Sequence, residues 1–273
     1  MNVITTQEIK QQVADIPKTI DEDVKRDDNP VWEELSPVVW RNAIYSDEAI
    51  DNCMGQLFIQ EISLFEEIIR KIKLENKKCA LIEVGMGTAE LFAKVYDECD
   101  MLIGVELSQQ MIDCAFQLHE TLRELNNKKV FLLQGNATEL NKVLKDNSHP
   151  EDHELWRQTT TRLTCMCMNT FGILPDHIRD LCIKEMFICS GPGGKLVIGC
   201  WHRDSMKTGY QQFYSKLPQL CGECREEDFD FEKGNFKCSS SDYTSHWFVK
   251  EELSSTLIKC FPGDASKDLT IEF

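Results

Sequence analysis

The stretch Ala80–Tyr96, ALIEVGMGTAELFAKVY, decides the fold. It begins as a short apolar run, breaks after Glu83 into Gly85-Met86-Gly87-Thr88-Ala89, and resumes with apolar residues at helical spacing. An apolar run that ends in glycines is typical of a buried strand, and the spacing beyond it is typical of a helix. Glycines in the connecting turn permit positive φ angles and a close approach to the backbone. The stretch therefore predicts a strand, a tight turn that a ligand contacts, and a helix.

The same alternation continues along the chain as far as residue 199. Apolar runs predict strands, and amphipathic segments between them predict helices. The predicted strands are 79–84, 101–105, 130–133, 163–168 and 195–199, with a last edge strand at 269–273, and the predicted helices are 90–97, 108–125, 138–144, 175–189 and 247–259. Strands that alternate with helices are joined by right-handed crossovers, so we expect a mostly parallel, doubly wound α/β sheet.

The chain divides into three parts by composition. Residues 1–30 are polar, with seven charged residues between 21 and 28, and are predicted to form a mobile arm. Residues 31–75 are predicted to form a helical cap, because apolar residues recur at three- and four-residue steps from Met54 to Ile72. The α/β domain is expected over 76–273, as one globular unit with the cap.

Composition excludes several classes of partner. The net charge of −16 argues against nucleic acid and anionic membranes, which need a basic surface. No apolar run approaches the ~20 residues of a membrane span, and no segment resembles a secretory signal. The thirteen cysteines lie mostly in apolar runs, which is typical of reduced thiols. We expect a cytoplasmic protein, and its acidity suits small neutral or cationic ligands without selecting any of them.

The glycine turn fits one nucleotide-binding pattern better than another. The dinucleotide fingerprint G-x-G-x-x-G/A, counted from Gly85, would place its last small residue at Glu90, which is large and charged. The spacing acid-x-G-x-G-x-G/A fits Glu83, Gly85, Gly87 and Ala89. A nicotinamide-dependent oxidoreductase is therefore the weaker interpretation.

Further motifs follow in order from 79 to 201. The second predicted strand ends at Glu106, about 20 residues after the glycines, and Leu107-Ser108-Gln109-Gln110-Met111 follows it. The third ends in Gly135-Asn136-Ala137, and the fourth in Asn169-Thr170-Phe171-Gly172. The turn Gly191-Pro192-Gly193-Gly194 precedes the fifth.

This ordered set resembles the S-adenosylmethionine-dependent methyltransferases of class I, which have a Rossmann-like fold. The resemblance implies a seven-stranded, mostly parallel sheet, S-adenosylmethionine as cofactor, and a ribose that is held by the second-strand acid. It implies adenine contacts at Met111 and at Asn136, where the family commonly has aspartate. The cofactor-binding residues implied are Glu83, Gly85, Gly87, Ala89, Glu106, Leu107, Met111, Asn136, Ala137 and Asn169.

The resemblance also narrows the acceptor. The string at 169–172 lacks the prolines of adenine-modifying relatives, and Cys165–Leu174 lacks the aspartates of the metal-dependent catechol type. We therefore expect a metal-independent enzyme that methylates a small molecule, with the nitrogen of an amine or amino-acid-like metabolite as first expectation. Oxygen or sulfur acceptors are an alternative, and a non-catalytic cofactor-binding scaffold is another.

Acceptor-site residues are predicted from the cap and from the segment after the fifth strand. His202 is the candidate base, because its ordinary pKa is near neutrality, and Tyr45 is a second catalytic candidate. The aromatic faces of Trp201, Tyr210 and Tyr214 could frame a cation. The predicted substrate-binding set is Trp40, Gln56, Phe171, Trp201, Tyr210 and Tyr214.

A C-x-x-C pair, Cys221 and Cys224, allows a competing interpretation. With Cys238 and His246 it has the ligand types of a tetrahedral zinc site, but the second half lacks paired spacing. Free thiols in a loop are favoured, and no metal is predicted.

Overall fold

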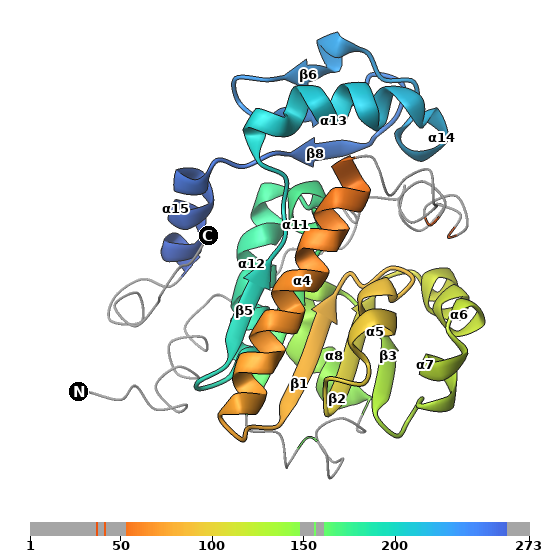
Figure 1. The fold of residues 1–273 in the computed structure, drawn as a ribbon. Helices are drawn as coiled ribbons and strands as arrows, with labels where there is room; N and C mark the ends of the chain where they lie inside the picture. Colours follow the sequence, from red (N-terminus) through yellow and green to blue (C-terminus); the bar gives the residue numbers. More distant parts are fainter. Residues whose placement is uncertain (1–36, 38–40, 42–52, 148–155, 157–160, 261–273) are drawn as a thin grey trace.

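The computed structural model describes residues 37, 41, 53–147, 156 and 161–260. Its main sheet consists of β1 (Cys79–Val84), β2 (Met101–Glu106), β3 (Val130–Gln134), β4 (Thr161–Met166) and β5 (Lys195–Ile198). The helices around it are α4 (Cys53–Leu74), α5 (Glu90–Val95), α6 (Gln109–Leu118), α7 (Glu120–Glu124), α8 (Leu140–Asp146), α11 (Thr170–Ile173), α12 (Asp176–Ser190) and α15 (Lys250–Cys260). Figure 1 shows α4 crossing one face of this sheet.

The five strands are parallel and lie in the order β3-β2-β1-β4-β5. From β1 the chain adds β2 and β3 on one side, and from β4 it adds β5 on the other side, so the strand order reverses between β1 and β4. Open parallel sheets bind ligands beyond the carboxyl ends of their strands at such a reversal. The glycine turn that follows β1 lies at this place.

Both faces of the sheet are covered, as expected for a doubly wound fold. Along β1, Ala80, Ile82 and Val84 point into a core that is shared with α8, α12 and α15. Cys79 and Leu81 point into a second core, shared with α4, α5, α6 and α7. Glu83 has the parity of the second set and therefore points to the α4 side.

A second, smaller sheet lies beyond the carboxyl ends of the main strands (Figure 1). It is antiparallel and consists of β6 (Phe229–Asp230), β7 (Asn235–Lys237) and β8 (Thr244–His246), packed with α13 (Met206–Gln212) and α14 (Pro218–Cys221). Trp247 is fully buried and stacks on Trp201, with ring centroids 4.9 Å apart. We call residues 201–247 the roof, because they cover this edge of the main sheet.

The structure confirms the parallel α/β fold but not the expected seven-stranded sheet. In the described part of the chain the main sheet has five strands, and the later strands form the separate roof sheet. The helix expected over 108–125 is two helices, because His119 has non-helical angles (φ −118°, ψ 88°). The predicted arm, the strand at 269–273 and most of the cap before 53 lie outside the described residues. None of the described helices is both long and apolar enough to cross a membrane.

The docking of α4 is testable by two neighbouring substitutions. Phe65 on α4 is fully buried, whereas Leu64 is 44% exposed. We expect Phe65→Ala to lower the free energy of unfolding by about 3–5 kcal/mol, because it leaves a cavity against the sheet. Leu64→Ala, the control, should change it by no more than about 0.5 kcal/mol. Urea unfolding measures both, and equal effects would contradict the packing of this helix.

Candidate functional site

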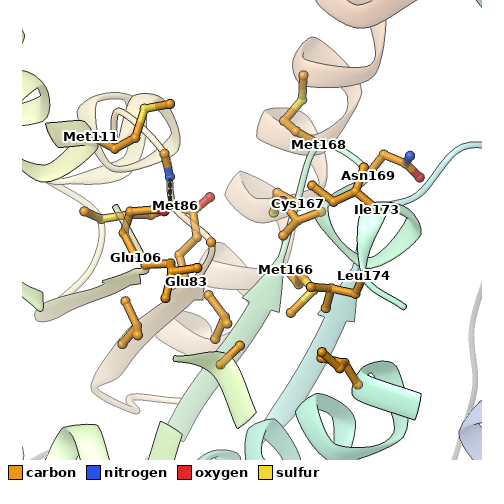
Figure 2. A pocket seen from close by; sticks show the side chains of 18 of the residues that line it. Glu83, Met86, Glu106, Met111, Met166, Cys167, Met168, Asn169, Ile173 and Leu174 are labelled. Carbon is orange, nitrogen blue, oxygen red and sulfur yellow. Dashed lines mark hydrogen bonds between the residues drawn. The ribbon is translucent and has the colours of Figure 1, made fainter. Parts of the chain in front are cut away.

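A pocket lies at the carboxyl ends of β1, β2, β3 and β4, between the main sheet and the roof. Its walls come from the glycine turn, the ends of four strands, the first turn of α4 and the roof. Figure 2 shows the sheet side of the pocket, with Glu83 and Glu106 facing Cys167 across it. The pocket lies where the reversal of strand order predicts a ligand. The sheet-side lining is Glu83–Gly87, Val105–Leu107, Met111, Gly135–Ala137 and Met166–Thr170, joined by Met54, Ile173, Leu174, Pro175, Ile178 and the roof residues Trp201, Phe213, Tyr214 and Tyr243.

The glycine turn has an unusual backbone that one carboxylate holds in place. Gly85 (φ 69°), Gly87 (φ 55°) and Ala89 (φ 60°) all adopt left-handed angles. The Glu106 carboxylate accepts hydrogen bonds from the backbone N–H groups of Gly87 (2.9 Å) and Ser108 (3.0 Å). Burial raises the pKa of Glu106, and these N–H donors oppose the rise. Glu106 thus fastens the turn after β1 to the end of β2.

Glu83 presents an unpaired carboxyl oxygen at the pocket. Its side chain is 4% exposed, and Oε2 has no hydrogen-bond partner. Burial, followed by repulsion from Glu61 and Glu106, raises its pKa well above the usual range. Buried polar atoms are rarely left without a partner, so this oxygen indicates a missing donor, either a proton or a ligand group.

Glu61 is a second buried acid near this site and is not among the residues predicted from the sequence. It lies on α4, one turn before Phe65, and both its oxygens approach the N–H of Met168 (2.9 and 3.2 Å). Its residue is 6% exposed, and burial raises its pKa to about 8. The sequence signal that could have identified Glu61 is an acidic residue at an apolar position of an amphipathic helix.

The residues that follow β4 are held by hydrogen bonds to α4 on one side and to the roof on the other. Met168 (φ 51°) and Asn169 (φ 61°) adopt consecutive left-handed angles, which are uncommon without glycine. Asn169 Oδ1 accepts from the N–H of Trp201 (3.0 Å), and its Nδ2 donates to Ser245 Oγ (3.0 Å). In Figure 2 this amide points away from Glu83 and Glu106. Asn169 thus ties β4 to the roof.

The roof contributes an aromatic surface with two buried phenols. Tyr214 Oη and Tyr243 Oη are 3.4 Å apart, and Tyr214 packs edge-on against Phe213. Burial is the main reason why the pKa values of Tyr214 and Tyr243 are raised. Both phenols are therefore neutral near pH 7 and act as hydroxyl donors or acceptors, not as phenolates.

The pocket brings together most of the predicted cofactor residues. Of that set only Ala89 is not in the lining, and it is fully buried behind the turn. Asn136 lines the pocket while its Oδ1 accepts from the backbone N–H of Thr138 (2.9 Å). The predicted residues in the lining are Glu83, Gly85, Gly87, Glu106, Leu107, Met111, Asn136, Ala137 and Asn169, with Trp201 and Tyr214 from the acceptor set.

The other predicted acceptor residues do not line the pocket. Phe171 packs in the core on Phe248 (5.4 Å between ring centroids), and Tyr210 packs on Phe229. His202 is exposed, and its Nδ1 accepts from the N–H of Asp204 (3.3 Å) at the start of a short 3-10 helix. Gln56 is also outside the lining, and Trp40 and Tyr45 lie outside the described residues.

The ionisable side chains among the described lining residues are all acids. The lining residues contain the carboxyl groups of Glu83 and Glu106, and none of the described lining residues is Lys, Arg or His. Much of the rest is thioether or aromatic, from Met54, Met86, Met166 and Phe213 among others, which sequence reasoning did not single out. Such a surface favours ligands that are neutral or cationic overall and disfavours ligands with a net negative charge, such as phosphates.

The competing zinc site is not assembled. No group of three or more His, Cys, Asp or Glu in the described parts of the chain is placed to hold a metal ion. The thiol of Cys221 lies near the backbone carbonyl oxygens of Tyr214 (3.9 Å) and Leu217 (3.8 Å). His246 instead lies 2.6 Å from Asn235 Oδ1 and 2.7 Å from Glu252 Oε1.

Comparison with known proteins gives fold-level likeness only. No protein-family model and no curated protein matches the sequence. Among solved structures, the PH0226 protein of Pyrococcus horikoshii is 15% identical, with 78% of this chain and 84% of that chain covered and a TM-score of 0.50. This likeness shows a shared fold.

Structures described as S-adenosylmethionine-dependent methyltransferases recur among the matches. One from Clostridium acetobutylicum is 14% identical, with 77% of this chain and 88% of that chain covered and a TM-score of 0.45. CalS10, an amino pentose methyltransferase from Micromonospora echinaspora in its SAM-bound form, is 15% identical, with 53% and 52% covered and a TM-score of 0.38. This chain spans about half the length of CalS10.

The buried acid on α4 predicts a pH-dependent stability. A carboxyl whose pKa is raised from about 4.5 to about 8 stabilises the fold below pH 4.5, and this stabilisation is lost as pH rises through 8. Glu61→Gln should therefore lose less stability than the natural protein between pH 5 and 8, by up to about 1.4 kcal/mol per pH unit. Thermal unfolding across this range measures the difference. Parallel profiles would show that Glu61 is already ionised in the folded protein.

Proposed function

We propose that the protein is an S-adenosylmethionine-dependent methyltransferase that acts on a small-molecule acceptor. The observation that carries the proposal is the glycine turn fastened to Glu106 at the carboxyl ends of β1 and β2. This arrangement places a backbone cradle and a carboxylate side by side at the edge where nucleosides bind in such sheets. The spacing of Glu83, Gly85, Gly87 and Ala89 supports the same cofactor.

The residues present fit that cofactor. Glu106 would accept hydrogen bonds from ribose hydroxyls, since each carboxylate oxygen has lone pairs beyond the one it gives to a backbone N–H. Leu107, Met111 and Ala137 offer apolar surface for adenine. The unpaired Oε2 of Glu83 would accept from the ammonium of the amino-acid end.

A dinucleotide fits less well. The described lining lacks a basic side chain for a pyrophosphate, and Glu90 occupies the position that should be small. Glu90 is buried and paired with Arg41 (3.0 Å) and His119 (3.5 Å), so it belongs to the structure around α5. The lack of a basic side chain among the described lining residues favours a nucleoside without phosphates.

The chemistry in this pocket would depend on positioning. The bound cofactor supplies an activated methyl group on a sulfonium. Apolar walls from Met54, Met168 and Phe213 would exclude water and hold the acceptor atom on the line of displacement. Positioning of this kind supplies roughly 7–11 kcal/mol of the barrier.

We propose nitrogen as the acceptor atom, in an amine or amino-acid-like metabolite. A neutral amine brings its own lone pair and needs no base, whereas an alcohol must lose a proton. Among the described lining residues the phenols and the two carboxyls have raised pKa values, and none is a histidine. The aromatic roof and the acidic lining also suit an amine. His202 as a base, and oxygen or sulfur as acceptor, remain alternatives.

Calorimetric titration with S-adenosylmethionine, S-adenosylhomocysteine and NADH tests the cofactor. We expect micromolar binding of the two sulfur nucleotides and none of NADH. Glu106→Ala should weaken binding by about 1.5–3 kcal/mol, because it removes a charged acceptor. Gly87→Val should abolish binding, because a side chain would fill the cradle and strain a left-handed residue.

The control for these variants is Glu124→Ala, which removes an exposed acid on α7. Circular dichroism and thermal unfolding establish that each variant is folded before it is titrated. Normal cofactor binding by folded Gly87→Val and Glu106→Ala proteins would contradict the placement of the site.

Turnover on a metabolite panel separates the enzyme from a binding scaffold. With S-adenosylmethionine present, we expect S-adenosylhomocysteine to form with some small amines and not with simple carboxylates or phosphates. The reason is the acidic lining without a described basic group. Tight cofactor binding with no turnover on any amine, alcohol or thiol would favour the scaffold. A preferred anionic acceptor would contradict the electrostatic argument.

A further inference from the structure

Glu61 and Glu83 form a pair of buried acids without a counter-ion. Glu61 lies on α4 and Glu83 on β1. The negative charge of Glu61 would raise the pKa of Glu83, and the charges of both acids would raise the pKa of Cys165 and of Cys167. They are 6% and 4% exposed. Two like charges this deeply buried are costly unless something cationic or a proton neutralises them.

The groups that face the pair do not supply a positive charge. The other titratable side chains that interact with it are Cys165 and Cys167 on or just beyond β4, Cys200 beyond β5, and Glu106 on β2. Burial raises the pKa of Cys165 and of Cys200, and a hydrogen bond with Cys165, followed by burial, raises the pKa of Cys167, so the three thiols are neutral. In the described part of the chain no lysine, arginine or histidine interacts with either acid.

The two acids differ in what they contact. Glu61 receives the Met168 N–H and does not line the pocket. Glu83 lines the pocket, and its Oε2 has no partner. In Figure 2 Glu83 lies on the same side of the pocket as Glu106, facing Met168 and Cys167 across it. A cation that enters the pocket would therefore reach Glu83 and not Glu61.

We propose that Glu61 and Glu83 hold protons in the free protein, and that the pocket takes up the ammonium group of its cofactor in exchange for one proton from Glu83. The inference rests on the proposed function for the identity of the ligand. In the exchange the Glu83 carboxylic acid ionises, its proton goes to solvent, and the carboxylate pairs with the ammonium. The proton that leaves offsets the positive charge of the ammonium. The net charge of the pocket therefore changes only by the charges on the other groups of the ligand. No bond other than O–H is broken.

Glu61 is a positioning residue in this exchange. It acts on the ligand through Glu83, whose ionisation is opposed by the charge that Glu61 acquires as pH rises toward 8, and through the Met168 N–H, which fixes the left-handed turn on the pocket wall. Glutamine at position 61 keeps an oxygen acceptor for this N–H but has no charge. The substitution therefore separates the electrostatic effect from the structural one.

Proton release during cofactor binding is the direct test. Calorimetric titration at one pH in two buffers with different ionisation enthalpies gives the number of protons released per ligand. For the natural protein between pH 6 and 7 we expect close to one proton with S-adenosylmethionine and with S-adenosylhomocysteine. The affinity should then rise about tenfold per pH unit in this range, by linkage. 5′-Methylthioadenosine, which lacks the ammonium, should bind without release.

Three variants assign the proton. Glu83→Gln should bind the nucleotides more weakly and release no proton. Glu61→Gln should bind with an affinity within about threefold of the natural protein at pH 6, where Glu61 is protonated. The pH at which release ceases should shift downward, because the charge that Glu61 acquires as pH rises toward 8 no longer opposes the ionisation of Glu83. Glu66→Gln, an exposed acid on the same helix, is the control and should match the natural protein.

The outcomes separate this inference from the proposed function. Binding of S-adenosylmethionine with no proton release, or with equal release by Glu83→Gln, overturns the exchange and leaves the methyltransferase proposal standing. No binding of either sulfur nucleotide overturns the proposed function and, with it, the ligand named here. In that case the unliganded pair is judged by pH titration of the Glu61 and Glu83 carboxyl carbons in NMR spectra, and ordinary midpoints below pH 5 would overturn the proton-holding pair as well.

Discussion

The hydrogen bonds from Gly87 and Ser108 to the Glu106 carboxylate are the interaction on which the site depends. They join the turn after β1 to the end of β2, two strands that are neighbours in the sheet. The turn itself has left-handed residues at Gly85, Gly87 and Ala89, a backbone that would be costly without such support. One carboxylate therefore both shapes the cradle and lines the pocket that the cradle forms.

The roof decides what kind of molecule this cradle can receive. A parallel sheet alone leaves its carboxyl edge open, whereas here the stacked Trp201 and Trp247 and the phenols of Tyr214 and Tyr243 close over it. Asn169 connects the two parts through Trp201 and Ser245. The result is a pocket with acidic groups on the sheet side and aromatic groups on the roof side. That division suits a cationic or neutral ligand with an apolar body.

The fold and the sheet side of the pocket could be predicted because their signals are local. An apolar run, glycines and a helical period follow one another within Ala80–Tyr96, and β1 has the predicted bounds. Met111 and Asn136 reach the pocket because each follows a parallel strand, and parallel strands end at one edge. Chain order is enough for such inferences.

The roof and Glu61 could not be predicted because their signals are non-local. The three short strands of the roof have too few residues to show a period of two, and their pairing depends on aromatic contacts such as Phe229 on Phe236. Aromatic residues after β5 gave no means to choose between Tyr210, which packs away from the pocket, and Tyr214, which lines it. Glu61 is an acid on an apolar stripe, and only the fold brings it near Glu83.

The most direct measurement is a crystal structure of the protein with S-adenosylhomocysteine. We expect the ribose hydroxyls on the Glu106 carboxylate, the adenine beside Met111 and the ammonium at Glu83. Density for the nucleoside elsewhere on the protein, or with its ribose away from Glu106, would contradict the central claim that the glycine turn and this carboxylate form the cofactor site.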